Sequence, residues 1–188
     1  WEPVYPRLEE AMPDKLSNVS LDVFMDAVNR VNPGPIRTVS DELTYPLHII
    51  IRYELEKKLI SGTIDVEELP DEWNKRYKKY LGITPSDDAE GVLQDIHWAA
   101  GEFGYFPSYL IGSAVAAQIY YHIESIMPVD RYLKEGNIAE IRSYLTENIY
   151  RYGKSIGTEK LLKKMTGNGF DVSYYIRYLT EKWGKTNE

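Results

Sequence analysis

Residues 91–118 read GVLQDIHWAAGEFGYFPSYLIGSAVAAQ. Polar and aromatic side chains gather in its first part, while residues 107–123 contain no Asp, Glu, Lys or Arg. Isolated buried polar groups cost free energy unless they have partners. The pattern therefore predicts a buried helix that delivers polar groups to a cleft. The candidate site residues here are Gln94, Asp95, His97, Trp98, Tyr105 and Tyr109.

The segment that precedes this stretch predicts a long amphipathic helix. Apolar residues recur at helical spacing from Leu43 to Leu59, and Gly62 is suited to end the helix. Pro46 lies within the pattern, where a proline removes a backbone donor and clashes with the preceding turn. We therefore expect a kink at Pro46 or a helix that begins nearby.

A second helix is predicted from Pro70 to Leu81. A proline is tolerated in the first helical turn, and Gly82 follows the last apolar residue. Trp73, Tyr77 and Leu81 recur at helical spacing and share one face. We expect that face to be buried.

Further helices are predicted on both sides of this region, and no alternating run with hairpin turns indicates a sheet. Ser20 is a suitable N-cap for one of them. The predicted ranges are 1–12, 21–31, 129–135, 138–152, 159–165 and 172–183. The fold class is therefore mainly α, a helical bundle, and the absence of a flexible linker predicts one domain over residues 1–188.

The composition excludes several classes of function. The formal net charge of the 188 residues is −7, whereas binding to a phosphate backbone needs clustered Lys and Arg, so nucleic acid is not the expected partner. No cysteine is present, which excludes disulfides and thiolate metal sites and fits a cytoplasmic protein. Residues 107–123 are too short and too polar to cross a bilayer, so no membrane partner is expected.

The histidines do not form a metal-binding motif. They are His48, His97 and His122, and none belongs to a His-Glu-x-x-His pattern, which places two zinc ligands one helical turn apart. We therefore expect no metal ligand and no complete zinc site within these residues. His48 lies in an apolar segment and His122 closes the uncharged run, so both are predicted to be structural.

Two motifs resemble those of the carboxypeptidase Taq family of metallocarboxypeptidases. The GxxQDxHW signature is met by Gly91, Gln94, Asp95, His97 and Trp98, and residues 101–109, GEFGYFPSY, continue the match. The I(R)xxA(S)D signature is met by Ile36, Arg37, Ser40 and Asp41. The two motifs occur in the family's order, and the resemblance extends from about Trp1 to the end of the chain.

The resemblance implies a mostly helical fold cut by a deep groove, and an enzyme that removes single residues from peptide C-termini by metal-assisted hydrolysis. The family's HExxH motif and the glutamate that is its third metal ligand lie upstream of the matched part. We therefore expect this chain, which begins at Trp1 rather than Met, to be the C-terminal portion and one wall of the groove. Zinc or a similar divalent ion, held by the missing N-terminal portion, and a homodimer are implied for the complete enzyme. This chain alone is expected to bind no metal and to be inactive.

Arg37 is the residue predicted to bind the substrate C-terminus. A guanidinium binds a carboxylate through two parallel charge-assisted hydrogen bonds. The alternative is a structural ion pair, for which Asp41, four residues further along the chain, is one candidate partner.

The resemblance also assigns roles to residues of the central stretch. His97, Tyr105 and Tyr109 are predicted to stabilise the oxyanion or the substrate, with packing in the core as the alternative. Gln94 and Asp95 are predicted to belong to the substrate-binding residues. Their expected task is to position the cleft and not to perform chemistry. Asp95 can orient His97 only if the chain bends, because residues two apart on a helix do not face each other.

Two other interpretations stay open. The chain could be a truncated or split-gene product that has lost catalysis and serves as a peptide-binding or assembly module. It could also be a helical interaction domain whose resemblance to the family is only ancestral.

Overall fold

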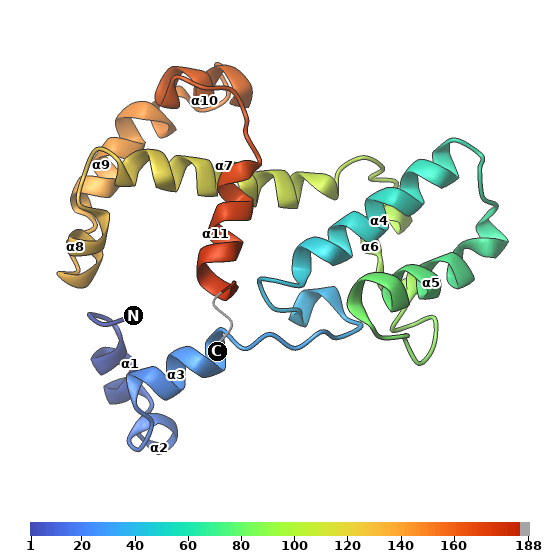
Figure 1. The fold of residues 1–188 in the computed structure, drawn as a ribbon, viewed down its shortest axis with the longest axis horizontal. Helices are drawn as coiled ribbons and strands as arrows, with labels where there is room; N and C mark the ends of the chain where they lie inside the picture. The colour runs from blue at the N-terminus through green and yellow to red at the C-terminus, as the bar shows by residue number, and fades with distance from the viewer. Residues whose placement is uncertain (185–188) are drawn as a thin grey trace. The chain divides into compact units, whose positions relative to one another are not determined.

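The computed structural model describes residues 1–184, and these residues form helices and loops without a strand (Figure 1). The mainly α prediction is therefore confirmed. The α-helices are α1 Tyr5–Ala11, α2 Pro13–Leu16, α3 Leu21–Val28, α4 Tyr45–Ile60, α5 Leu69–Leu81, α6 Ile96–Ala99, α7 Pro107–Glu124, α8 Val129–Lys134, α9 Ala139–Asn148, α10 Thr158–Thr166 and α11 Ser173–Trp183. Short 3₁₀ helices lie at η1 Arg37–Val39, η2 Val66–Glu68, η3 Val92–Gln94 and η4 Tyr150–Tyr152.

The chain divides into two compact units. The central unit comprises Asn29–Ile111, and the terminal unit comprises Trp1–Val28 together with Gly112–Glu188. The division falls inside α7. That residues 1–188 form one domain stays a prediction, and each unit is described by itself.

In the central unit, α4 and α5 lie side by side (Figure 1). Pro46 occupies the first turn of α4, so the helix begins nearby, which is one of the two outcomes expected from the sequence. Gly62 and Gly82 follow α4 and α5 with φ of 65° and 75°, the left-handed conformation that glycine adopts without a steric penalty. The predicted helix boundaries are confirmed at these positions.

The core of the central unit lies between these two helices. The predicted stripe of α5 is buried, with Trp73 stacked on Tyr77 at 5.1 Å between ring centroids. The buried apolar residues of this core are Ile51, Leu55, Ile64, Leu69, Trp73, Tyr77, Leu81 and Val92. Ile83, which follows Gly82, and Trp98, in α6, pack against this core.

Helix α7 is buried mainly in its later turns. Its buried residues are Ala114, Ala117, Gln118, Tyr121 and Ile123, whereas Ile111 before them is 52% exposed. The prediction that the uncharged run forms a buried helix is therefore wrong for its first turns. A lack of charge does not require burial, because apolar atoms make up much of any protein surface.

Helix α3 also differs from its prediction. Ser20 Oγ accepts a hydrogen bond from Val23 N at 3.3 Å, as a capping residue does, but α3 ends at Val28 and has no buried residue. Phe24, in α3, packs against the rings of Trp1 and Tyr5, with centroids 4.9 and 5.1 Å away.

No helix within residues 1–184 is long and apolar enough to cross a membrane.

Candidate functional site

Asp95 organises the short helix α6. Its backbone is extended, with φ −84° and ψ 109°, so it precedes the helix as the N-cap residue. Its Oδ1 accepts hydrogen bonds from His97 N at 2.8 Å and Trp98 N at 3.1 Å. The chain therefore bends at Asp95, which was the condition for Asp95 to approach His97, and the carboxylate lies close to the His97 ring.

A buried charge cluster surrounds Asp95. Arg52, from α4, is 1% exposed and donates to both Asp95 oxygens, from Nε to Oδ2 and from Nη2 to Oδ1 at 3.2 Å. Its Nη1 donates to Glu56 Oε2 at 2.6 Å. Glu56 also accepts from Trp98 Nε1 at 2.9 Å and from the backbone N of Gly104. The cluster therefore ties α4 to α6 and to the loop that follows α6.

Arg52 and Glu56 were not identified as site residues from the sequence. Their i,i+4 spacing is the same in an ordinary exposed ion pair on a helix surface, which contributes little. The available signal was their position beside Ile51 and Leu55, on the face of α4 that the apolar spacing assigns to the core.

The ring of His97 lies among three aromatic side chains. It stacks on Tyr105 at 5.8 Å between centroids, and Phe106 and Tyr109 lie at 5.2 and 5.9 Å. His97 Nε2 is 3.4 Å from Tyr109 Oη. His97 is 8% exposed, whereas Tyr105 and Tyr109 are 51% and 41% exposed. The arrangement therefore offers two exposed tyrosines beside a buried imidazole.

The surroundings of His97 favour its neutral form. Burial, and then the positive charges of Arg37 and Arg52, lower the pKa of His97. Its Nδ1 is 3.8 Å from Asp95 Oδ1, and within the described chain this buried nitrogen has no hydrogen-bond partner. At 3.8 Å this approach is too long for a hydrogen bond. One buried nitrogen of His97 is left for a further partner.

Arg37, in η1, is buried against the same aromatic group. Its guanidinium lies 4.8 Å from the centroid of Phe106, and its Nη1 is 3.8 Å from Asp95 Oδ2. That distance is too long for a hydrogen bond, and Nη1 is buried without a hydrogen-bond partner among residues 1–184. Arg37 and His97 therefore each have one buried nitrogen that forms no hydrogen bond within the described chain.

The structural ion pair of Arg37 is with Asp95 and not with Asp41. The carboxylate of Asp41 accepts hydrogen bonds from Asn32 N, Leu43 N and Thr44 N, and from the Thr44 hydroxyl. These bonds lower the pKa of Asp41 against the opposing effect of burial, which is the largest single contribution. Asp41 thus joins Asn32 to the residues that directly precede α4.

Gln94 fixes the segment that carries Arg37. Its Oε1 accepts from Arg37 N at 3.1 Å, and its Nε2 donates to the carbonyl oxygens of Pro35 at 3.0 Å and Glu90 at 2.7 Å. All of these partners are backbone atoms. Gln94 positions the site through the backbone, and its predicted contact with substrate stays a prediction.

The other two histidines each contact a tyrosine hydroxyl. His48 is 2% exposed, its Nδ1 is 2.9 Å from Tyr77 Oη, and burial lowers its pKa to about 4. His122, in the terminal unit, has Nε2 at 3.0 Å from Tyr144 Oη. His48 Nε2 is buried without a hydrogen-bond partner among residues 1–184, and the structural role of both histidines stays a prediction. Within residues 1–184, no group of three or more His, Asp or Glu side chains is arranged to hold a metal ion.

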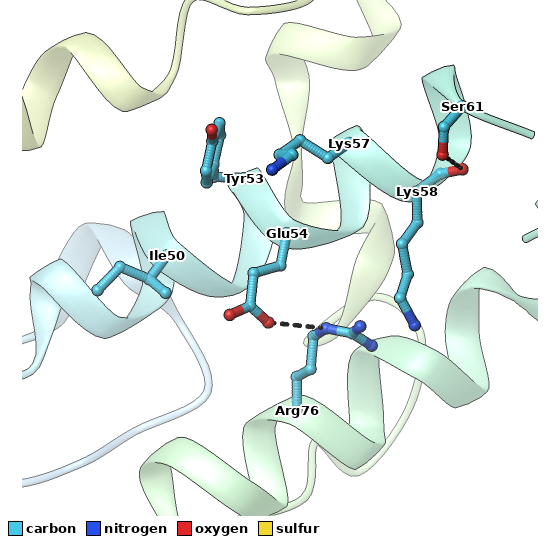
Figure 2. Close-up of a pocket in the computed structure, with 7 residues that line it drawn as sticks. All are labelled: Ile50, Tyr53, Glu54, Lys57, Lys58, Ser61 and Arg76. Atoms are coloured by element: carbon cyan, nitrogen blue, oxygen red, sulfur yellow. Dashed lines mark hydrogen bonds and ion pairs between the residues drawn. The ribbon is translucent and has the colours of Figure 1, made fainter. Parts of the chain in front are cut away.

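Among the described residues of the central unit, two of the hollows are not lined by Arg37, His97, Tyr105 or Tyr109. Figure 2 shows the first, of about 610 Å³, where Glu54 turns toward Arg76 and pairs with it at 3.3 Å. The second, of about 600 Å³, is mostly apolar. It is lined by Tyr53, Glu56, Lys57, Ile60, Ser61, Phe103, Gly104 and Pro107. The candidate site is therefore the cluster around Asp95 and His97, all of it within the central unit.

Comparison with known proteins identifies relatives over nearly the whole chain. The model of the carboxypeptidase Taq (M32) metallopeptidase family matches residues 1–183. Carboxypeptidase 1 of Bacillus subtilis is 47% identical over 184 residues, which cover 97% of this chain and 37% of that protein. Thermostable carboxypeptidase 1 of Pyrococcus furiosus is 39% identical over 183 residues, covering 97% of this chain and 36% of that protein.

Solved structures share the fold. The M32 carboxypeptidase of Deinococcus radiodurans R1 superimposes with a TM-score of 0.94 at 34% identity, over 98% of this chain and 38% of that chain. The metallocarboxypeptidase 1 of Trypanosoma cruzi gives a TM-score of 0.92 at 38% identity, over 98% of this chain and 39% of that one. The chain thus spans little more than a third of the length of the relatives it matches.

Proposed function

The chain belongs to the carboxypeptidase Taq (M32) metallopeptidase family, and on that premise we propose that it forms the substrate-binding wall of a metal-dependent carboxypeptidase. The complete enzyme would remove single residues from the C-termini of peptides. The observation that supports this most directly is Arg37, a buried guanidinium with an unused donor beside the aromatic cluster of His97.

Arg37 is the proposed binding site for the terminal carboxylate of the peptide. A buried donor without a partner costs free energy, and a carboxylate would satisfy it through a charge-assisted hydrogen bond. Asp95 Oδ2, at 3.8 Å, is too distant to satisfy it. The Phe106 ring under the guanidinium keeps its plane in place, which lowers the cost of ordering it when the substrate binds.

His97, Tyr105 and Tyr109 are proposed to stabilise the substrate and the oxyanion of the reaction. Donors aimed at a developing negative charge are most effective where water is excluded. The two tyrosines are exposed to an incoming peptide, and the neutral imidazole carries one N–H that can donate. Gln94 and Asp95 would hold these groups in place.

The divalent ion of the family does not fit among the described residues, because they form no group of metal-binding side chains. We propose that the ion is zinc, held by an N-terminal portion with the HExxH motif, and that this chain is inactive without that portion. A homodimer and a cytoplasmic location complete the proposal.

The first test compares this chain with the product of its full gene. We expect the gene product to be heavier than 21.8 kDa, to carry one divalent ion per chain and to hydrolyse peptides, whereas this chain binds no ion and hydrolyses no peptide. Intact mass, metal analysis and release of C-terminal amino acids measure this. A gene product of 21.8 kDa without metal would instead support a non-catalytic peptide-binding or assembly module.

The second test concerns Arg37 in the complete enzyme. Its readout is the carboxylate preference, defined as the ratio of the inhibition constants of a blocked dipeptide amide and of the same dipeptide with a free carboxylate. Arg37→Ala should lower this preference by about 30-fold or more, because it removes one partner of a buried charge pair. Arg151→Ala, which removes an exposed arginine paired with Glu147, is the control. An unchanged preference in Arg37→Ala would refute the proposed role.

A further inference from the structure

Two arginines approach one carboxylate in the central unit. Arg52 reaches both oxygens of Asp95 with hydrogen bonds, whereas Arg37 Nη1 stays 3.8 Å from Oδ2. An arginine that binds a carboxylate with two donors forms the stronger and more specific pair. Asp95 is therefore occupied by Arg52, and Arg37 is left with an unused donor.

Arg52 is held in this position from the other side as well. Its Nη1 donates to Glu56 Oε2 at 2.6 Å, and its guanidinium lies 4.4 Å from the ring centroid of Trp98 and 4.8 Å from that of Phe106. With 1% exposure it has no room to turn toward water. The side chain is fixed by two carboxylates and two aromatic rings.

The charges of this cluster balance only when all four members are present. Arg37 and Arg52 carry two positive charges, and Asp95 and Glu56 carry two negative ones. If a neutral side chain replaced Arg52, Asp95 would be a buried carboxylate without its main partner, which costs free energy. Arg37, whose Nη1 lies 3.8 Å from Asp95, would then be the cation left to pair with this carboxylate. The Arg37 guanidinium also lies over the Phe106 ring. Asp95 would then compete with the substrate for Arg37.

We propose that Arg52 is a positioning residue for substrate recognition: by occupying both oxygens of Asp95, it keeps Arg37 available for the terminal carboxylate of the peptide. Glu56 supports this role, since it orients Arg52 and holds the loop of Gly104, which leads to Tyr105. The inference rests on the proposed function of Arg37. It assigns to α4 a part in specificity, although Arg52 does not touch the substrate.

The test replaces Arg52 by Met in the complete enzyme and measures the carboxylate preference, KM and kcat. Loss of one charge-assisted hydrogen bond to the substrate should lower the preference about tenfold and raise KM by a similar factor, with kcat less affected. The double variant R52M/D95N should recover most of the preference. The asparagine that D95N introduces can still cap α6, but its neutral amide no longer attracts Arg37.

This rescue separates positioning from a merely structural role. If Arg52 only stabilised the fold, Arg52→Met would reduce the folded fraction and leave the preference unchanged, because a ratio of inhibition constants does not depend on enzyme concentration. That result, or a preference that D95N fails to restore, would overturn the proposal. Arg151→Met is the matched control for losing an arginine from an i,i+4 pair.

A milder variant keeps the test decisive if Arg52→Met does not fold. Arg52→Lys retains the charge but offers a compact ammonium in place of the planar fork, so Asp95 is only partly occupied. We expect a loss of preference of about threefold, and an unchanged value would contradict the proposal. Arg37→Ala distinguishes the two levels of the argument: if it too leaves the preference unchanged, the proposed role of Arg37 fails; if it alone lowers the preference, only the role of Arg52 fails.

Discussion

At the scale of single residues, His48 shows how burial sets the charge of a group. It lies at 2% exposure in α4, with its ring edge-on to Tyr77 at 5.4 Å between centroids. Burial lowers its pKa from 6.5 to about 4, and the nearby positive charge of Arg37 acts in the same direction. The native chain therefore keeps His48 neutral well below the pH at which an exposed histidine takes up a proton.

This neutral histidine should make the chain sensitive to acid. Between pH 6.5 and about 4 the unfolded chain binds a proton at His48 and the native chain does not, so stability is present above 6.5 and falls as pH decreases. The loss reaches up to about 3 kcal/mol at the lower end. Urea unfolding of wild type and His48→Gln across this range should show a smaller acid-induced loss in the variant.

The control for this prediction is His122→Gln. It removes a histidine that also meets a tyrosine hydroxyl, but one that is only half-buried. Because His48 is still present, this variant should lose stability in acid as the wild type does. Parallel pH profiles of wild type and His48→Gln would contradict the assignment.

At the scale of elements, glycines act differently at the end of a helix and within one. Gly82 follows α5 in the left-handed conformation, with φ 75°, whereas Gly112 lies within α7. A Cβ atom added at either position would meet nothing within 4 Å. The effect of adding one therefore depends on the backbone conformation and not on space.

The same substitution should have opposite signs at these two glycines. Gly82→Ala should destabilise the chain by about 1 kcal/mol, because an L side chain is strained at positive φ. Gly112→Ala should stabilise it by up to about 1 kcal/mol, because alanine has the higher helix propensity. The free energies of unfolding of the two variants in urea test this directly. Changes of the same sign would show that the conformational argument is wrong.

At the scale of the whole molecule, each unit contains a buried or half-buried glutamine whose side chain forms hydrogen bonds to backbone segments distant in sequence. Gln94 binds the backbone at residues 35, 37 and 90 in the central unit. Gln118, 1% exposed, donates to Gly169 O at 2.8 Å and accepts from Asp171 N at 3.0 Å in the terminal unit. Both residues bond to backbone atoms, and Gln94 is the one that bonds to the backbone of Arg37.

Replacing these glutamines by Met should therefore separate stability from recognition. Both Gln94→Met and Gln118→Met should destabilise this chain by about 1–3 kcal/mol, because buried backbone groups lose their partners. In the complete enzyme, only Gln94→Met should lower the carboxylate preference, since it releases the backbone of Arg37. Gln118→Met is the matched control. An equal loss of preference in both variants would indicate a general loosening of the fold.

The sequence by itself determined the family, the helical class and the ends of the central helices. Pro46, Gly62, Pro70 and Gly82 mark those ends because a missing N–H or a positive φ acts locally, whatever the residue packs against. The motif residues Arg37, Asp95 and His97 were also found from the sequence, through their resemblance to the family.

Only the tertiary structure decided which charges are buried. An i,i+4 pair such as Arg52 and Glu56 has the same local pattern on an exposed face as in a core, so the sequence could not distinguish the two cases. The partner that keeps Arg52 buried, Asp95, lies 43 residues away and comes into contact only when α6 packs on α4. Hydrogen bonds and charge balance between distant segments are properties of the folded chain, and they determine which donor of the site is left for a ligand.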